Sequence, residues 1–453
     1  MTDDANEDCT RRTFVRSAGA TVGIMAVAGC KTGGGSNKPT LASGAGALTN
    51  TEGADTIRVG LIGCGGRGSG AAGQALKADP GVVLYAMADA FTDRLESSRG
   101  HLTNTYGARV DVPDERRFIG FNAYQQVMDS DVDVVILTTP PHFRPEHFKA
   151  AVAAGKHVFM EKPMALDGPG VRSILEDARI AREKKLNIMG GFCWRYNTPN
   201  RVCYERIHNG AIGDITCVHS TYLTAPLGTK PRQDDWSDME WQLRNWQHFN
   251  WLSGDHIAEQ ACHAIDKINW AKNDVHPAKA IALGGRQLRE TPESGNIYDH
   301  FSVMYVYDDG SRCFHDCRQM PGCWNDNTEY LIGTNGTCYI NSWGPTQEIS
   351  GPNEWAYEGP NPNMYQVEHD ELFEAIRGTR DRIDDVDQMM ASTLMAIMGR
   401  MSAYSGQQIT WDEALNSTER LGPDRYAMGD LPVMAVSVPG NVASWDDLRN
   451  AEV

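Results

Sequence analysis

Three glycines follow the first apolar run of the globular part of the chain at a spacing that suits a phosphate-binding loop. Gly63, Gly65 and Gly68 read G-x-G-x-x-G directly after residues 57–62. Glycines let a backbone approach a pyrophosphate, and the N-terminus of a following helix can face its charge. Asp89 closes the next apolar run, where a carboxylate can hold the hydroxyls of an adenosine ribose. The pattern predicts a dinucleotide site, with NAD favoured over NADP because Asp89 would repel a 2′-phosphate.

Two cationic residues are placed to act in such a site. Arg67 lies inside the glycine loop and is expected to add a contact to the phosphates. Lys162 ends the run Met160-Glu161-Lys162-Pro163. In a doubly wound sheet the carboxyl ends of the strands face the ligand crevice, so Lys162 is expected to point at whatever lies against the nicotinamide. A protonated amine there can hold a hydroxyl oxygen and stabilise a developing alkoxide, although a solvated lysine at a strand end is the alternative explanation.

The elements that must position these residues alternate over residues 56–192. The apolar runs that predict strands are 57–62, 82–88, 132–138, 157–160 and 186–192. The stretches that predict helices are 68–78, 91–105, 145–154 and 170–185. Such alternation is typical of right-handed βαβ units in a parallel sheet. Residues 56–192 are therefore expected to form an α/β nucleotide-binding domain of the Rossmann type.

The pattern changes after Tyr196. Strand-like runs follow at 215–223, 279–288, 301–307, 312–317 and 330–340. The sequences Asp308-Asp309-Gly310 and Thr334-Asn335-Gly336 are typical of tight turns between neighbouring strands. Residues 193–420 are expected to form an α/β domain with an open, mainly antiparallel sheet. A tail at 421–453 is expected to wrap the surface or a neighbouring subunit.

The N-terminus has the features of an export signal. Residues 10–16 read Thr-Arg-Arg-Thr-Phe-Val-Arg, a twin-arginine pattern, and an uncharged stretch follows. That stretch is too short to span a bilayer comfortably and ends in Val27-Ala28-Gly29-Cys30, which resembles a lipobox. We expect residues 1–29 to be a signal peptide, Cys30 to carry a lipid anchor, and residues 30–55 to be a flexible tether. The protein is then exported and lies in the periplasm or at the cell surface.

Composition limits the partners. The formal charge of −17 and the absence of a Lys/Arg-rich stripe argue against nucleic acid as a partner. The eleven cysteines are mostly scattered singly through apolar segments, which indicates reduced core residues. No set of cysteines and histidines has the spacing of a zinc site, and no metal site is expected.

Residues 63–68, Asp89, Thr139-Pro140 and residues 154–163 together resemble the Gfo/Idh/MocA family, named for glucose-fructose oxidoreductase and inositol dehydrogenase. The resemblance covers roughly residues 56–420. It implies bound NAD, a carbohydrate substrate, and a C-terminal domain whose open sheet supports homodimers or homotetramers. The cofactor-binding residues that it implies are Gly63, Gly65, Arg67, Gly68, Asp89, Thr139, His142, Glu161 and Lys162.

The same resemblance implies the catalytic residues Lys162, Glu259 and His263. The family's Asp-x-x-x-His element is matched by Glu259-Gln-Ala-Cys-His263, in which glutamate replaces aspartate but the helical i, i+4 spacing is kept. His263 is the best general base, because a hydride can leave a sugar carbon only as the hydroxyl proton is taken. A buried core histidine is the alternative for His263 alone. His256, Glu259 and His263 on one helical face are a less favoured metal set.

The residues predicted to contact the substrate are Arg195, Tyr196 and Asp266. Trp194-Arg195-Tyr196 begins the second domain and is expected to face the cleft, where an aromatic ring and a guanidinium suit a sugar ring. Core packing is the alternative for the aromatic side chains. Weaker candidates for a carbohydrate surface include Trp241, Trp246 and Trp251.

Three functions fit these features. The first is an NAD-dependent oxidoreductase acting on a carbohydrate hydroxyl, with a tightly held cofactor because free NAD is not available outside the cytoplasm. The second is a redox-neutral NAD-dependent glycosidase, favoured by the loop Gly65-Gly66-Arg67-Gly68 and opposed by residues 190–196, which differ from the corresponding glycosidase segment. The third is a sugar-binding lipoprotein without catalysis.

Overall fold

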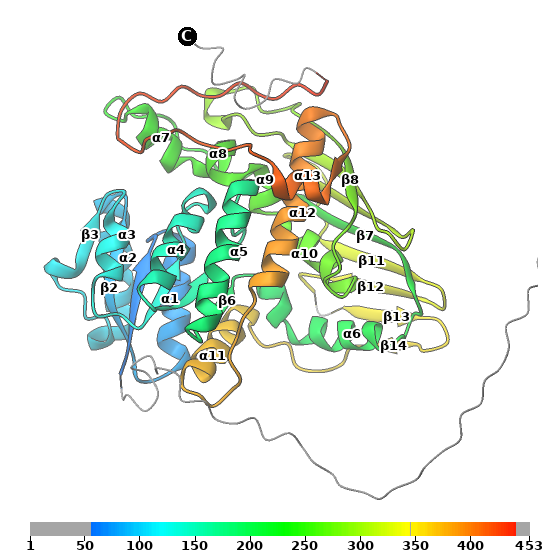
Figure 1. The fold of residues 1–453 in the computed structure, drawn as a ribbon, viewed down its shortest axis with the longest axis horizontal. Coiled ribbons are helices and arrows are strands. Elements are labelled where there is room, and N and C mark those ends of the chain that lie inside the picture. Colours follow the sequence, from blue (N-terminus) through cyan, green and yellow to red (C-terminus); the bar gives the residue numbers. More distant parts are fainter. Residues whose placement is uncertain (1–55, 345, 441–453) are drawn as a thin grey trace, which may run out of the picture. The chain divides into compact units, whose positions relative to one another are not determined.

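Six parallel strands form the first sheet of the computed structural model, which describes residues 56–344 and 346–440 (Figure 1). The strand order is β3-β2-β1-β4-β5-β6. These strands are β1 (Ile57–Ile62), β2 (Val82–Asp89), β3 (Arg117–Ile119), β4 (Val134–Leu137), β5 (His157–Met160) and β6 (Ile188–Gly190). The order reverses between β1 and β4, so a crevice lies at their carboxyl ends. The predicted Rossmann domain is confirmed, and β3, a short edge strand, was not predicted.

The strands are mainly apolar because helices cover both faces of the sheet. The side chains of β4 alternate between two cores: Val134 and Ile136 face one, and Val135 and Leu137 face the other. On the first face lie α1 (Gly66–Ala78) and α2 (Thr92–Tyr106). On the second face lie α3 (Ala123–Met128), α4 (Arg144–Ala153) and α5 (Gly168–Glu183).

The second sheet has nine strands in the order β14-β13-β12-β11-β7-β10-β9-β8-β15. They are β7 (Ile215–Thr224), β8 (Lys279–Gly285), β9 (His300–Val306), β10 (Arg312–Gln319), β11 (Thr328–Gly333), β12 (Thr337–Asn341), β13 (Gln347–Ser350), β14 (Trp355–Ala356) and β15 (Ile409–Thr410). Only the β7–β10 pair is parallel among the described strands of this sheet. The predicted tight turns join β9 to β10 and β11 to β12. The expected open, mainly antiparallel sheet is confirmed.

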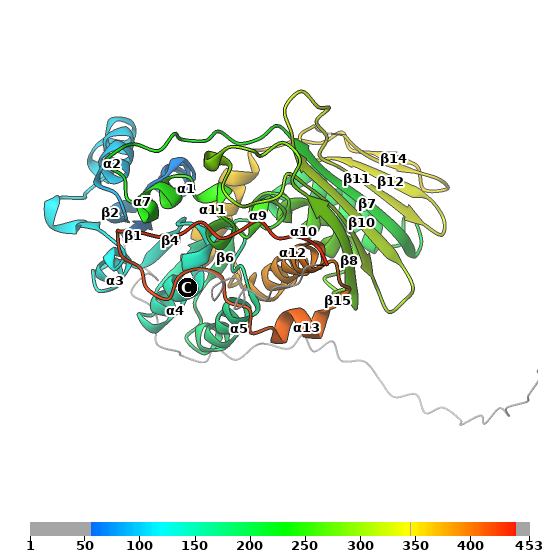
Figure 2. The same ribbon diagram turned by 90° about the horizontal axis from the view of Figure 1, so that it is seen from above.

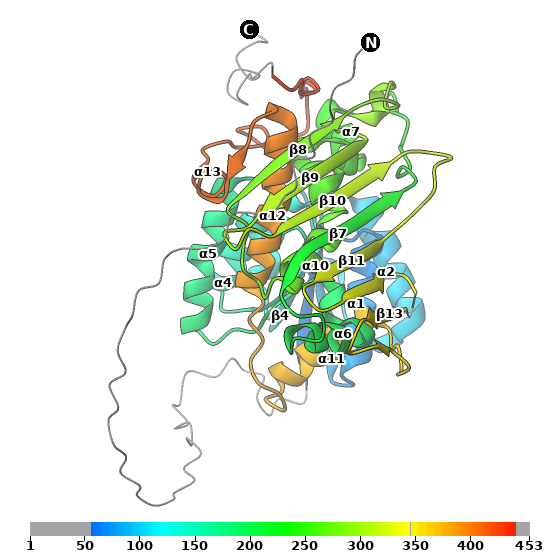
Figure 3. The same ribbon diagram turned by 90° about the vertical axis from the view of Figure 1, so that its right-hand side faces the viewer.

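Among the described residues, helices cover only one face of this sheet. That face packs against α10 (Cys262–Ala271) and α12 (Val386–Ser405), while α6 (Thr198–His208) packs on β13 near the edge. Figure 3 views the opposite face, on which the strands lie in front of the helices. Large apolar side chains on this open face are at least a third exposed: Ile281, Leu283, Phe314, Tyr330, Ile332 and Tyr339.

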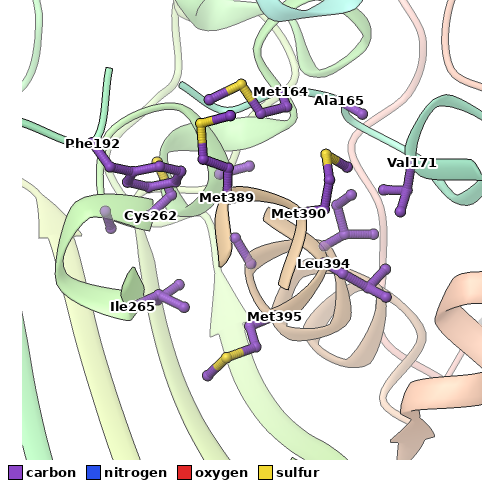
Figure 4. Close-up of a cluster of buried hydrophobic side chains, with 14 of the residues drawn as sticks. Met164, Ala165, Val171, Phe192, Cys262, Ile265, Met389, Met390, Leu394 and Met395 are labelled. Atoms are coloured by element: carbon purple, nitrogen blue, oxygen red, sulfur yellow. The ribbon is translucent and has the colours of Figure 1, made fainter. Parts of the chain in front are cut away.

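The helix α12 joins the two domains through a core rich in sulfur. Met389, Met390 and Met395 are buried on α12, with Met389 on the side of Phe192 and Cys262 and Met390 on the side of Val171 (Figure 4). Methionine is flexible and polarisable, so it fills irregular space between elements of different geometry. Seven of the nine described cysteines are buried, where they act as small apolar residues.

Another helix from the C-terminal half packs onto the Rossmann domain. This helix, α11 (Met364–Ile376), lies against α1. Its residues Leu372, Phe373 and Ile376 complete the core beneath β1 and β4. The Rossmann core is therefore built from two separate parts of the chain.

A short helical segment and the C-terminal segment lie against each other. The helical segment contains α7 (Asp238–Arg244), α8 (Asn250–Ser253) and α9 (Asp255–Glu259). Residues 421–440 follow α13 (Trp411–Asn416), and their backbone hydrogen-bonds with residues of α7. None of the helices in the described residues is long and apolar enough to cross a membrane. The predicted signal peptide and tether, at residues 1–55, lie outside the described residues.

Candidate active site

A cavity of about 600 Å³ lies at the carboxyl ends of β1, β2, β4 and β5. Its Rossmann side consists of the glycine loop, Asp89, Thr139, Glu161 and Lys162. Its other side comes from the second half of the chain and includes Tyr222, Arg244, Trp246, His248, Glu259 and His263. The cavity therefore brings together most of the predicted cofactor residues and all three predicted catalytic residues.

The glycine loop has the geometry that its spacing predicts. Gly63 has a φ of +97°, and a Cβ atom on it would lie 2.6 Å from the backbone of Thr138. A Cβ on Gly68 would lie 1.9 Å from the carbonyl oxygen of Gly63, so only glycine lets α1 approach β1 this closely. Gly65 and Gly66 have open space where a Cβ would lie. The loop thus leaves room for a pyrophosphate at the start of α1, and the residues fit a dinucleotide.

Asp89 is fixed at the end of β2. Its Oδ2 accepts a hydrogen bond of 2.6 Å from the backbone N–H of Cys64, and its Oδ1 accepts one of 3.0 Å from that of Phe91. Burial raises the pKa of Asp89, and these two backbone hydrogen bonds oppose the rise. The carboxylate lines the cavity and retains further lone pairs for ribose hydroxyls.

Arg67 is held by carboxylates rather than left free in the loop. Its guanidinium donates to Glu161, to Gln74 at 2.7 Å and to Glu368 of α11 at 2.7 Å. Arg67 lines the cavity and is half-buried. The structure shows it linking the glycine loop to the residue before Lys162, while a contact to phosphate stays a prediction.

Lys162 lies against Glu259. Its Nζ donates to the backbone carbonyl of Glu259 and is 3.7 Å from Oε1 of the same residue. Burial lowers the pKa of Lys162, but the neighbouring acidic groups, of which Glu259 contributes most, together outweigh burial and raise the pKa. Lys162 is therefore a protonated donor at neutral pH.

His263 is a neutral imidazole in the same cavity. Burial lowers its pKa well below the usual range, and the positive charge of Lys162 lowers it further. Among the described residues, no group hydrogen-bonds to its Nδ1. A neutral histidine near a protonated lysine can accept a proton that the lysine cannot.

Comparison with known proteins finds a family match for the first domain. Residues 57–192 match the sequence model of the Gfo/Idh/MocA family, described as an oxidoreductase family with an NAD-binding Rossmann fold. The first domain is therefore similar to the NAD-binding Rossmann domain of this family.

Individual relatives extend this result in part. Inositol 2-dehydrogenase 3 of Saccharopolyspora erythraea is 34% identical over 258 residues, which are 57% of this chain and 65% of that protein. A glycosyl hydrolase family 109 protein of Streptomyces coelicolor is 29% identical over 37% of this chain and 34% of its own length. The chain thus spans less than two thirds of the length of these curated relatives.

The fold of both domains recurs in solved structures. The aldose-aldose oxidoreductase of Caulobacter crescentus superimposes with a TM-score of 0.63 at 18% identity, covering 78% of this chain and 99% of that one. The likeness therefore includes the open sheet as well as the Rossmann domain, although residues 193–420 lie beyond the match to the family model.

The structure places the predicted substrate contacts Arg195 and Asp266 against each other in the core. Neither lines the cavity. Arg195 donates to Asp266 at 2.8 and 2.9 Å and to Asp274 at 2.6 Å. Asp266 is 1% exposed and also accepts from Ser392. A buried carboxylate requires a partner, and Arg195 supplies it, so both side chains are held in the core.

Tyr196 and His142 also lie outside the cavity lining, against prediction. The hydroxyl of Tyr196 donates a hydrogen bond of 2.6 Å to Asp385 at the start of α12, and the tyrosine ring is buried. His142 Nε2 lies 2.7 Å from the hydroxyl of Tyr426, and its ring meets Trp251 edge-on. His142 thus packs among aromatic side chains of α8 and of the C-terminal segment and does not line the cavity.

The continuous helical face that was expected to carry Glu259 and His263 is absent. The helix α9 ends at Glu259 and α10 begins at Cys262. The two residues meet the cavity from either side of this break. His256 packs edge-on against Phe301, and no group of three His, Cys, Asp or Glu side chains in the described residues could hold a metal ion.

Several cavity residues were missed by the sequence analysis. His147 stacks on Tyr124 at 4.2 Å, and its Nδ1 lies 3.3 Å from the hydroxyl of Thr139. Burial lowers the pKa of His147 to about 3. Tyr222 enters from the end of β7, and only its position at a strand end could have indicated it. Of the tryptophans noted above, Trp246 lines the cavity, whereas Trp241 and Trp251 are buried in an apolar cluster.

Proposed function

We propose that this protein is an NAD-dependent oxidoreductase that acts on a carbohydrate hydroxyl and keeps its cofactor bound. One observation carries the proposal: a protonated Lys162 and a neutral His263 line the same cavity as a glycine loop with room for a pyrophosphate. The relationship to an inositol 2-dehydrogenase supports a polyol or sugar as the substrate class.

The roles of the residues follow from their charges. Bound NAD supplies the hydride acceptor. Lys162 donates a hydrogen bond to the reacting hydroxyl oxygen and stabilises the negative charge that develops there. His263 takes the hydroxyl proton, because its lowered pKa keeps it neutral and able to accept. Glu259 keeps Lys162 charged and directs its Nζ.

A retained cofactor needs a second substrate. Oxidation of one carbohydrate hydroxyl to a carbonyl removes two electrons and two protons. A second carbohydrate whose carbonyl is reduced to a hydroxyl takes them up, so no free NAD is required. This exchange suits an exported enzyme, which meets sugars but not a pool of nicotinamide cofactor.

Export and anchoring are part of the proposal. The order of paired arginines, apolar stretch and lipobox-like Val27-Ala28-Gly29-Cys30 supports twin-arginine export and a lipid anchor at Cys30. Fractionation of cells tests both steps. Cys30→Ser is expected to release the protein from membranes, and Arg11→Lys with Arg12→Lys is expected to retain it in the cytoplasm. A wild-type protein found soluble in the cytoplasm would contradict export.

We also propose that the open face of the second sheet joins copies of this chain. Its apolar residues Leu283 and Phe314 are 76% and 37% exposed. Contiguous exposed apolar area of this kind marks an association surface. The molar mass measured by light scattering is expected to be that of a homodimer or homotetramer. The double change Leu283→Lys with Phe314→Lys is expected to lower this molar mass.

The glycosidase remains a second candidate because of one relative. The Streptomyces coelicolor match is a glycosyl hydrolase family 109 protein. In such a redox-neutral reaction, oxidation at C3 acidifies the C2 proton, the aglycone is eliminated, and water adds before the hydride returns. The same cavity residues would then act on a glycoside.

One assay separates the two candidates. Purified protein is denatured to identify released NAD, and native protein is then given free sugars or aryl glycosides in deuterated water. The oxidoreductase is expected to turn over repeatedly only with a carbohydrate pair and to leave C2 unexchanged. Many turnovers on a single glycoside, with deuterium at C2 of the released sugar, would instead establish the glycosidase.

A further inference from the structure

A segment of the second domain reaches across the cavity to the Rossmann domain. This segment, residues 225–249, is called the α7 arm here; it follows β7 and includes α7 and the turn Trp246–His248. Figure 1 shows α7 above the Rossmann helices α2, α3 and α4, and Figure 2 looks down on it from above. Lys230, Arg244 and Trp246 of the arm line the same cavity as the glycine loop and Asp89. The arm thus forms the cavity wall that faces the cofactor residues.

Arg244 makes the contact between the arm and the Rossmann domain. Its two terminal nitrogens donate hydrogen bonds of 3.0 Å, one to each carboxylate oxygen of Asp93. Its guanidinium also lies over the ring of Phe91, 4.0 Å from the centroid. Phe91 and Asp93 lie two and four residues after Asp89, the residue placed to hold the adenosine ribose. Arg244 therefore lies at the part of the cavity where the adenosine is expected.

The arm is held in this position from both sides. Leu243 and Trp241 of the arm belong to one apolar cluster that also includes Phe121 and Phe143 of the Rossmann domain. Within the arm, Asn245 accepts from the backbone N–H of Lys230 at 2.7 Å and donates to its carbonyl at 3.0 Å.

The C-terminal segment fixes the outer side of the arm. The backbone N–H of Met239 donates a hydrogen bond of 3.1 Å to the carbonyl of Gly429. The backbone N–H of Leu431 donates one of 3.1 Å to the carboxylate of Asp238. The side chain of Gln242 donates 2.7 Å to the carbonyl of Leu431. Opening the arm therefore requires several contacts to break together.

We propose that the α7 arm is a clasp that retains the dinucleotide between turnovers, with Arg244 as its closing contact over the adenosine end. This inference rests on the proposed function, because it assumes that NAD is the ligand. A dinucleotide in the cavity can leave only after Arg244 releases both Asp93 and the ring of Phe91. The Lys162 end is not closed by Arg244, so substrates can exchange there while the cofactor stays.

The experiment measures the release of NAD from the purified full-length protein. The protein is loaded with labelled NAD and diluted into excess unlabelled NAD, and the retained label is followed with time. Arg244→Met is expected to accelerate release about tenfold, since it removes an ion pair and a cation–π contact together. Asp93→Asn removes only the ion pair and is expected to accelerate release about threefold.

Arg232→Met is the matched control. Arg232 lies in the same arm, pairs with Asp238 at 2.5 Å and lies over the ring of Trp241, so its described partners belong to the arm itself. Its replacement is expected to leave the release rate unchanged. High salt is expected to accelerate release from the wild type but hardly from Arg244→Met, because only the wild type has the ion pair to screen. A purely structural role of Arg244 would not give this difference in salt dependence.

The outcomes separate the clasp from the proposed function. If the wild type neither contains nor binds NAD, the proposed function fails and the clasp fails with it. If the wild type binds NAD but Arg244→Met and Asp93→Asn release it at the wild-type rate, the clasp alone is overturned. Thermal unfolding identifies a misfolded Arg244→Met protein, in which case Asp93→Asn, a change at a largely exposed side chain, decides the question.

Discussion

The two walls of the cavity are built in different ways. The Rossmann wall comes from loops that directly follow strands of one parallel sheet, so Gly63, Asp89 and Lys162 lie at equivalent ends of β1, β2 and β5. The opposite wall comes from a strand end, the α7 arm and a break between two short helices, which supply Tyr222, Arg244, Glu259 and His263 in turn. Local sequence is enough to place a residue on the first wall, whereas the second depends on how distant segments pack.

The largest expected loss of activity comes from a substitution on the Rossmann wall. Lys162→Met is expected to lower kcat by about 10³-fold or more, because it removes the charge that stabilises the alkoxide. Retained NAD and the unfolding temperature are expected to stay near the wild-type values. Lys230→Met, the same change on the opposite wall, is the control and is expected to lower kcat far less. Unchanged turnover in Lys162→Met would indicate a binding protein or another catalytic group.

Arg195→Met tests the correction to the predicted substrate site. The change leaves Asp266 buried without its main partner, which is expected to cost about 3 kcal/mol of unfolding free energy. Chemical denaturation measures this loss. KM for the carbohydrate is expected to stay unchanged below the new unfolding temperature, and a raised KM in a fully folded variant would return Arg195 to the substrate site.

His263→Gln tests the second wall and is expected to lower kcat by about 10²-fold. In the wild type the pKa of His263 is held below its usual value by burial and by Lys162. The base is active when unprotonated, so activity falls only as the pH drops through that lowered pKa. The acidic limb of kcat/KM is therefore expected well below pH 6.5, about the ordinary histidine value. An acidic limb at or above that pH would show that another group is the base.

Asp89→Ala is expected to have the smallest effect of the four, weakening NAD binding by about tenfold. The carboxylate orients the loop through Cys64 and Phe91 and offers its remaining lone pairs to the ribose. Calorimetry or the label-release assay measures the change. Recovery of NADP rather than NAD from the wild-type protein would contradict the role assigned to Asp89.

Helix packing explains why the predictions failed where they did. Trp194-Arg195-Tyr196 follows the last Rossmann strand, but the short turn at Cys193–Tyr196 packs against α11 and does not line the cavity. There Arg195 donates hydrogen bonds to Asp266, and the hydroxyl of Tyr196 donates one to Asp385, which directly precedes α12. A sequence pattern does not predict which distant residues will pair, and a buried charge requires a partner of opposite charge close to it.

The sequence alone determined the Rossmann domain, its glycine loop, Asp89 and Lys162, because strand periodicity and strand ends are local properties that the parallel sheet converts directly into a crevice. It also predicted the open sheet from alternation and turn residues. Tertiary structure alone decided which residues of the second half reach the cavity. The break after Glu259 brought His263 to it, the α7 arm brought Arg244 over Phe91, and the C-terminal segment packed against His142. These positions depend on contacts between segments far apart in the chain, and only the packed molecule contains those contacts.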